Sequence, residues 1–245
     1  MKPLTTSFCC PQDLSVEQVR QLFELYDYYY GGTSASLFEH DLCQKDWILL
    51  LHGEQGQICG FSTLKIITAQ HQNQNIRAIF SGDTIIAHEY WGSQTLPLAW
   101  CELIGRIAAE QPETPLYWLL IVKGDRTYRY LNVFSKQYFP NRKIPTPPDV
   151  QSLIHQLARS LFGEHYLPEQ GIVHYPQSRG YLKPKWHNPS TASNPEARFF
   201  AERNPHFADG DELVCLTLLR EDNLKSFALR GFQAGIAQGS LKDKS

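Results

Sequence analysis

The stretch Ile76-Arg-Ala-Ile-Phe-Ser-Gly-Asp-Thr-Ile-Ile-Ala-His-Glu-Tyr-Trp-Gly-Ser-Gln-Thr-Leu-Pro-Leu-Ala-Trp-Cys-Glu-Leu-Ile-Gly-Arg-Ile107 decides the fold of this chain. Residues 76–87 are rich in β-branched side chains and predict a strand, whereas the apolar residues after position 97 recur at helical spacing. Gly92-Ser93 predicts a tight turn between them, with Ser93 as the N-cap and Pro97 in the first helical turn. Such a unit presents unpaired backbone N–H groups, which commonly bind phosphates.

We therefore expect the turn to bind the anionic part of a cofactor. The residues expected to do so are Ile86, Ala87, Trp91, Gly92, Ser93, Gln94 and Thr95. The alternative is a packed strand–helix unit in which Gly92 only makes the turn, because short glycine motifs occur often by chance.

Composition limits the classes of protein to consider. The 245 residues, 42% of them hydrophobic, are enough for one elaborated domain or two small ones. A formal net charge of -2 argues against a broad nucleic-acid or anionic-membrane surface. No partner follows from the net charge alone.

The cysteines and apolar runs indicate the compartment. The six cysteines lack CxxC spacing, and the N-terminus lacks a basic segment followed by an apolar run. The longest apolar runs, such as 47–51 and 116–122, fall far short of the roughly 18 residues of a membrane-spanning helix. We expect a soluble, reduced, cytoplasmic protein.

The N-terminal half alternates between helical and strand patterns. Helices are expected over 15–29, with Ser15 and Gln18 as a capping box, and from Ser34 or Ser36 to about 44. Strands are expected over 47–52, 58–67 and 76–87, joined by turns at 53–56 and 71–75. After the helix that follows Gly92, we expect a buried strand over 116–122 and a helix over 125–136.

The C-terminal half predicts further elements around a polar loop. Strands are expected over 171–175 and 212–219, and helices over 149–162, over 195–203 and from an Asp222 cap to about Gly231. Residues 183–195 form a long polar loop. We divide the chain into a core at 1–140, an extension at 141–235 that completes the sheet and covers the cleft, and a disordered tail at 236–245. The expected fold class is α/β (α+β), with a mixed, mainly antiparallel central sheet flanked by helices.

The order of two helices, three strands, helix, strand, helix, with a phosphate-type turn after the third strand, resembles the GNAT superfamily of acyl-CoA-dependent acyltransferases. In that family the turn resembles V-x-P-x-Y-R-G-x-G-x-G, and Ile86-Ala-His-Glu-Tyr-Trp-Gly-Ser-Gln-Thr-Leu96 lies along it. Tyr90 and Gly92 match, whereas Trp91, Gln94 and Leu96 do not. Side chains at Gln94 and Leu96 limit how closely a phosphate can approach the backbone. The resemblance covers residues 14–140 directly.

This resemblance implies transfer of an acyl group from acyl-CoA, or from an acyl-carrier protein, to a small amine or hydroxyl. The donor is a co-substrate, so no tightly bound cofactor is expected. The family often has a tyrosine that protonates the leaving thiolate, in a Y-x-x-x-G-F segment. This chain has Phe134 there, so Tyr130, Tyr138 or no side chain takes that role.

The expected catalytic base is Asp83. By the period of two, Asp83 shares a face of its strand with Ser81, Ile79 and Ile85, and we expect this face to contact the acyl acceptor. The alternative is a structural aspartate in a β-bulge after Gly82. His88 is a second candidate base, with a solvated histidine as its alternative.

Other polar residues predict substrate contacts more weakly. Arg179 and Lys183 belong to a basic and aromatic cluster that could bind an acidic acceptor or a phosphate, although the pattern favours a solvated loop. Asp209, Asp211 and Glu212 lack the spacing of known metal sites, so we expect a turn there and no metal.

Three functional hypotheses remain at this stage: an acyltransferase, a non-catalytic module that binds an acyl thioester or another ligand, and a structural protein that retains the fold. An open V between the strands that end near Asp83 and Leu119, filled by a long ligand, would favour the first two. A cleft filled by aromatic side chains favours the third.

Overall fold

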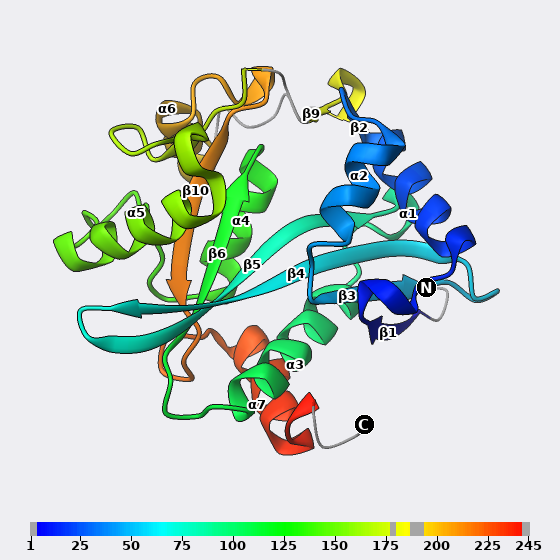
Figure 1. The fold of residues 1–245 in the computed structure, drawn as a ribbon, viewed down its shortest axis with the longest axis horizontal. Helices are drawn as coiled ribbons and strands as arrows, with labels where there is room; N and C mark the ends of the chain where they lie inside the picture. The colour runs from blue at the N-terminus through cyan, green and yellow to red at the C-terminus, as the bar shows by residue number, and fades with distance from the viewer. Residues whose placement is uncertain (1–3, 177–179, 187–193, 242–245) are drawn as a thin grey trace.

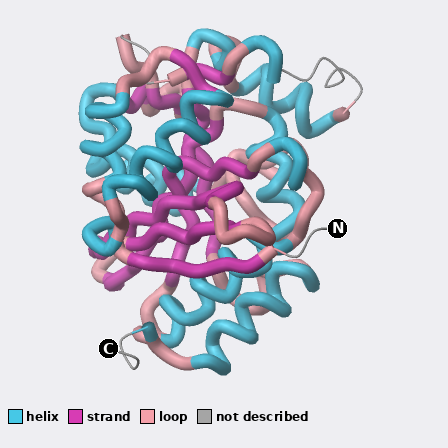
Figure 2. The backbone as a smooth tube through the Cα atoms, turned by 90° about the vertical axis from the view of Figure 1, so that its right-hand side faces the viewer, coloured by secondary structure: helices cyan, strands magenta, loops and turns pink. Residues whose placement is uncertain are grey.

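The fold described here is that of a computed structural model, which describes residues 4–176, 180–186 and 194–241. One eight-stranded sheet, in the order β1-β3-β4-β5-β6-β10-β8-β7, forms its centre. Helices cover both faces of this twisted sheet (Figures 1 and 2). The strands are β1 (Thr5–Cys9), β3 (Trp47–His52), β4 (Ile58–His71), β5 (Gln74–Ile86), β6 (Leu116–Val122), β7 (Tyr166–Leu167), β8 (Ile172–Val173) and β10 (Glu212–Leu218).

Seven α-helices surround the sheet within the described residues, and two short strands form a separate pair, β2 (Tyr30–Gly31) with β9 (Tyr181–Leu182). None of these helices is long and apolar enough to cross a membrane. The helices are α1 (Val16–Tyr29), α2 (Ala35–Leu42), α3 (Thr95–Ala109), α4 (Asp125–Phe134), α5 (Pro148–Phe162), α6 (Pro195–Arg203) and α7 (Ser226–Gln238).

The predicted fold class is confirmed. Every strand pair of the large sheet is antiparallel except β5 with β6, which is parallel. β10 lies between β6 and β8, so the C-terminal half supplies strands to the same sheet. Strand β1 was not predicted, because Thr5–Cys9 is a short edge strand without an apolar alternation.

The β4–β5 hairpin is longer than predicted. β4 continues to His71, and a two-residue connection, Gln72-Asn73, has positive φ angles of 47° and 63°. Positive φ at both positions is typical of the tight hairpin turn whose twist matches the strands. The predicted end of β4 at residue 67 was therefore wrong.

The helix starts depend on side-chain caps. Ser15 and Gln18 form the predicted capping box at α1. At α3 the cap differs from the prediction, because the helix begins at Thr95 and Gln94 occupies the N-cap position. The hydroxyl of Ser93 instead accepts a hydrogen bond from the N–H of Thr95 at 3.2 Å, which supports the turn one residue earlier.

Helix α7 contradicts the predicted C-terminus. It continues through Gly231 to Gln238 and packs beside α3 (Figure 1). A Cβ on Gly235 would lie 2.0 Å from the carbonyl oxygen of Glu102, and one on Gly105 would lie 2.0 Å from that of Phe232. These glycines therefore allow two helix backbones to approach closely and do not end the helix.

Two further expectations at this end were wrong. Asp222 does not cap the helix but forms an ion pair with Arg220, with the Nε–Oδ1 distance 2.6 Å. The predicted disordered tail begins too early, because residues 236–238 are helical and Leu241 is 8% exposed.

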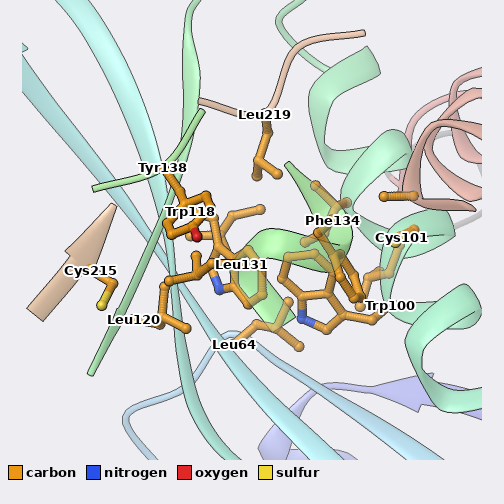
Figure 3. Packing of buried hydrophobic residues seen from close by; sticks show 14 of the residues in the cluster. Leu64, Trp100, Cys101, Trp118, Leu120, Leu131, Phe134, Tyr138, Cys215 and Leu219 are labelled. Atoms are coloured by element: carbon orange, nitrogen blue, oxygen red, sulfur yellow. The ribbon is translucent and has the colours of Figure 1, made fainter. Parts of the chain in front are cut away.

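The buried residues form three clusters. The largest lies between the sheet and α3, α4 and α7; a second lies under α5; and a third lies under α1 and α2. In the largest cluster, Trp100, Trp118 and Phe134 pack together (Figure 3), and the ring centroids of the two tryptophans are 4.5 Å apart. Cys101 and Cys215 are buried in this cluster.

Candidate functional site

The strands β5 and β6 separate at their C-terminal ends. They are paired from Arg77–Leu116 to Ser81–Leu120, and β5 then continues unpaired with β6 to Ile86. On the other side of β5, pairing with β4 passes from Leu64–Ser81 to Ser62–Thr84. Two residues of β5, Gly82 and Asp83, thus oppose Thr63 alone, which defines a β-bulge.

The bulge changes which residues share a face. Ile79 packs in the cluster under α3, whereas Ile85 packs in the cluster under α1 and α2. Ser81 accepts a hydrogen bond from the indole N–H of Trp118 at 2.8 Å on the α3 side. The prediction that Asp83 and Ser81 face the same way was therefore wrong, because the extra residue shifts the alternation. The alternative of a bulge aspartate after Gly82 is the observed geometry.

A cavity of about 770 Å³ occupies the space where β5 and β6 diverge. Its size is within the range of small-molecule sites in proteins. Its walls come from the ends of β5 and β6, from α1 and α2, and from the starts of α3 and α4. Trp100, Trp118 and Phe134 line this cavity without filling it. The opening between these strands is therefore a cavity and is not filled by these aromatic side chains.

Charged side chains surround Asp83 in the cavity. The Nζ of Lys45 lies 2.6 Å from Oδ2 of Asp41, and the Nζ of Lys123 lies 3.4 Å from Oε1 of Glu212. These five residues come from α2, the loop before β3, the bulge of β5, the end of β6 and the start of β10. Three carboxyl groups and two ammonium groups therefore share one partly buried volume.

This environment sets the proton affinity of Asp83. Burial, with a smaller contribution from Asp41, raises the pKa of the Asp83 carboxyl to about 6, against the opposing effect of Lys123 and Lys45. Burial also raises the pKa of Glu212. A carboxylate with a pKa near 6 can accept a proton efficiently near neutral pH. The bulge thus places a suitable base at the opening between the strands.

The predicted anion-binding turn borders the same cavity. Gly92 has φ +90°, and a Cβ there would meet nothing within 4 Å. Ile86, Trp91, Gly92 and Ser93 line the cavity, whereas Ala87, Gln94 and Thr95 do not. The N–H of Ser93 donates to the carbonyl of Tyr90 at 3.0 Å, and that of Thr95 donates to Ser93. Among the described residues, the N–H groups of Gly92 and Gln94 donate to no other group.

His88 lies outside the cavity lining, in a short 3₁₀ turn (His88–Tyr90). Its backbone N–H donates to the hydroxyl of Tyr29 at 2.6 Å. The His88 ring packs among aromatic rings, with its centroid 6.1 Å from that of Tyr28 and 5.4 Å from that of Trp186. This placement makes His88 part of an aromatic cluster beside the turn.

The candidate proton donors separate in space. Tyr130 lines the cavity and is 43% exposed. Tyr138 is buried outside the lining and donates to Oε2 of Glu196 at 3.2 Å. Burial, reinforced by Glu196, raises the pKa of Tyr138 to about 12. Only Tyr130 of the two has access to a ligand in the cavity.

The basic and aromatic cluster predicted near residue 180 is only partly described. Arg179 lies outside the described residues. Lys183 does not line the cavity; its Nζ lies 3.6 Å from Oδ2 of Asp27 and also donates to the Asp27 carbonyl. The neighbouring Trp186 does line the cavity and donates to the carbonyl of Tyr28 at 3.2 Å. The segment therefore covers the end of α1.

The sequence alone did not show which charged residues gather around Asp83 in the cavity: Asp41, Lys45, Lys123 and Glu212. Each stands near the end of a predicted helix or strand, where a charged residue is common and carries little information. Only their convergence around Asp83 makes them notable, and that convergence depends on the sheet order.

No protein-family model matches this chain, and no curated protein sequence matches it. Solved structures resemble part of it. A conserved protein of Enterococcus faecalis V583, described as a probable N-acyltransferase, is 14% identical, with a TM-score of 0.42, over 56% of this chain and 33% of that protein. The GNAT family N-acetyltransferase YhbS of Escherichia coli, in complex with CoA, is 13% identical, with a TM-score of 0.39, over 55% of this chain and 69% of that protein. An acyl-CoA N-acyltransferase of Pseudomonas aeruginosa is 12% identical, with a TM-score of 0.40, over 53% of this chain and 86% of that protein.

At TM-scores this low, the matches carry no argument about activity. The fold is identified from the order and pairing of the helices and strands. Two helices precede three antiparallel strands, α3 follows the turn at Gly92, and β6 lies parallel to β5. The later strands β8 and β10 are antiparallel neighbours. The fold is GNAT-like.

Proposed function

We propose that this protein is an acyltransferase that moves an acyl group from acyl-CoA to an amine or hydroxyl acceptor. The observation that carries this proposal is that Asp83 and the Gly92–Ser93 turn line one cavity, where β5 and β6 separate. A base and an anion-binding turn on the two sides of a strand opening suit a two-substrate transfer.

In this proposal the thioester lies between the separated strands. The acceptor nitrogen or oxygen attacks the thioester carbon while Asp83 takes its proton. The new bond to carbon forms as the carbon–sulfur bond breaks, and the thiolate takes a proton from Tyr130 or from water. Tyr130 is the donor supported by its place in the cavity lining.

A binding module without catalysis is the second candidate. It is favoured by Phe134, which is 4% exposed, lines the cavity and stands where the family often has a tyrosine. A phenyl ring cannot donate a proton to a thiolate.

Two measurements distinguish these candidates. Thermal-shift titration with CoA, acetyl-CoA and longer acyl-CoAs should raise the melting temperature, because a ligand at a hundred times its Kd stabilises by about 2.7 kcal/mol. Release of free CoA thiol in the presence of a panel of amines and alcohols then reports transfer. Binding without acceptor-dependent release supports the module, and absence of both contradicts the acyl-donor site.

We expect Gly92→Val to weaken CoA binding more than it lowers stability. A β-branched residue is strained at φ +90°, and its side chain would stand among the N–H groups of the turn. Gly56→Val is the matched control, because Gly56 has φ +77°, has nothing within 4 Å and lies outside the cavity lining. Calorimetric Kd values and urea melts should show similar stability losses for both variants but weaker binding only for Gly92→Val. Equal CoA affinities would indicate a purely structural turn.

We also expect Lys123→Met and Glu212→Gln to shift the pH profile of kcat/KM in opposite directions. Lys123→Met removes an ammonium group and should raise the pKa of Asp83, so the acid limb of the pH profile should move to higher pH. Glu212→Gln removes a neighbouring carboxylate and should lower the pKa of Asp83, so the acid limb should move to lower pH. Shifts of about one pH unit are typical when one neighbouring charge is removed. Asp41 and Lys45 remain in both variants. Parallel shifts, or none, would mean that the acid limb belongs to another group.

A further inference from the structure

Arg126 lies in the first turn of α4 and lines the cavity. Its guanidinium carbon lies 4.4 Å from the ring centroid of Trp91, the residue before Gly92. Among the described residues, no carboxylate forms an ion pair with Arg126, because the adjacent Asp125 pairs with Arg129, with the Nε–Oδ2 distance 3.2 Å. Arg126 is thus an exposed cation next to the turn, and it has no counter-ion within the part of the chain that the structure describes.

The Trp91 ring, over which the Arg126 guanidinium lies, is held in place by two contacts. The indole N–H of Trp91 donates to the carbonyl of Ile86 at 2.8 Å. The ring of Trp186 packs against it with the centroids 5.5 Å apart. A guanidinium on a fixed aromatic face keeps its N–H groups free in its own plane. Arg126 is therefore oriented before any ligand binds.

The turn alone offers few donors to a phosphate. Of the four N–H groups from Gly92 to Thr95, those of Ser93 and Thr95 already donate within the protein. Gln94 and Leu96 carry side chains where closely wrapped phosphate loops have glycine. A diphosphate at this turn would need a cation from elsewhere, and bidentate pairing to phosphate oxygens is the favoured contact of arginine.

We propose that Arg126, resting on Trp91, binds the diphosphate of a nucleotide thioester and so selects CoA over the arm of a carrier protein. This inference rests on the proposed function. A carrier-protein arm has one phosphodiester and no nucleotide, so it would gain less from a guanidinium at the turn. Arg126 acts here as a binding residue and takes no part in the transfer itself.

The test measures Kd by calorimetry for CoA, 4′-phosphopantetheine and pantetheine. In the wild type we expect CoA to bind most tightly and pantetheine most weakly. Arg126→Gln should raise the Kd for CoA at least about tenfold, because the variant loses the charge-assisted hydrogen bonds that the guanidinium would donate to phosphate oxygens. The Kd for pantetheine should stay within about twofold. Trp91→Leu should weaken CoA binding in the same selective way.

Arg230→Gln is the matched control, because Arg230 also lies over an aromatic ring, that of Phe227 at 5.9 Å, and neither residue lines the cavity. It should leave all three Kd values unchanged. Tight CoA binding that survives Arg126→Gln would overturn the inference but leave the proposed function intact. Equal affinity of the wild type for CoA and 4′-phosphopantetheine would overturn the selectivity. If the wild type bound neither CoA nor acetyl-CoA, the proposed function itself would fail.

Discussion

Asp83→Asn is expected to lower kcat at neutral pH by about 10²-fold or more while leaving the affinity for CoA nearly unchanged. Asp83 is the carboxylate that the β-bulge turns into the opening between β5 and β6, and an amide cannot accept the proton of the acceptor. The measurement pairs steady-state kinetics with calorimetric Kd values for CoA.

Asp222→Asn is the control for this prediction, because Asp222 is exposed, pairs with Arg220 and does not line the cavity. Its kinetics should equal those of the wild type. Wild-type rates from Asp83→Asn would show that water or another group takes the proton, and would shift weight to the ligand-binding module.

Asp83→Asn should also stabilise the folded protein at neutral pH. The pKa of Asp83 is raised from 3.8 to about 6, so the folded state holds its proton more tightly than the unfolded state. The cost of the charged carboxylate therefore appears as the pH rises from about 4 through 6. It reaches at most about 3 kcal/mol. Urea melts of both proteins should coincide near pH 3.5 and differ at pH 7.5, with Asp83→Asn the more stable.

Gly235→Ala is expected to cost more stability than a typical surface or core substitution. Helix propensity alone would favour alanine by about 1 kcal/mol. The added Cβ, however, would lie 2.0 Å from a backbone oxygen of α3, so one helix must move. We expect a loss of about 3 kcal/mol or more, which corresponds to a fall of roughly 6–12 °C in melting temperature.

Ala237→Gly serves as the comparison on the same helix, because Ala237 is exposed. It changes the backbone propensity without touching α3 and should cost about 1 kcal/mol. A smaller loss for Gly235→Ala than for Ala237→Gly would mean that α7 does not pack tightly against α3.

Much of the fold follows from local patterns. The capping box at Ser15, the apolar run of β6 and the stripe of α5 each determine one element by their spacing, so their type could be predicted. The glycines of α7 could not be interpreted in this way. A glycine that ends a helix and one that admits a neighbouring helix are identical in sequence, and only the position of α3 distinguishes them.

The candidate site was predictable to the extent that it is continuous in sequence. The turn at Gly92 lies directly after its strand, so the pattern located it. The orientation of Asp83 depended on whether Gly82 forms a bulge, which the sequence left open. Lys123 and Glu212 meet only because β10 lies beside β6. Arg126 reaches Trp91 only because α4 begins opposite α3. Contacts of this kind need the tertiary arrangement.

The position of β10 has a consequence for the protein during synthesis. β6 is an apolar strand, and one of its edges is free until Leu213–Leu218 arrives to pair with Val122–Tyr117. A nascent chain therefore exposes an aggregation-prone edge while roughly ninety further residues are made, and a polypeptide released early keeps that edge open. Fragments that stop before Glu212 should aggregate or depend on chaperones. Any attempt to express the N-terminal part alone should include residues through the end of β10.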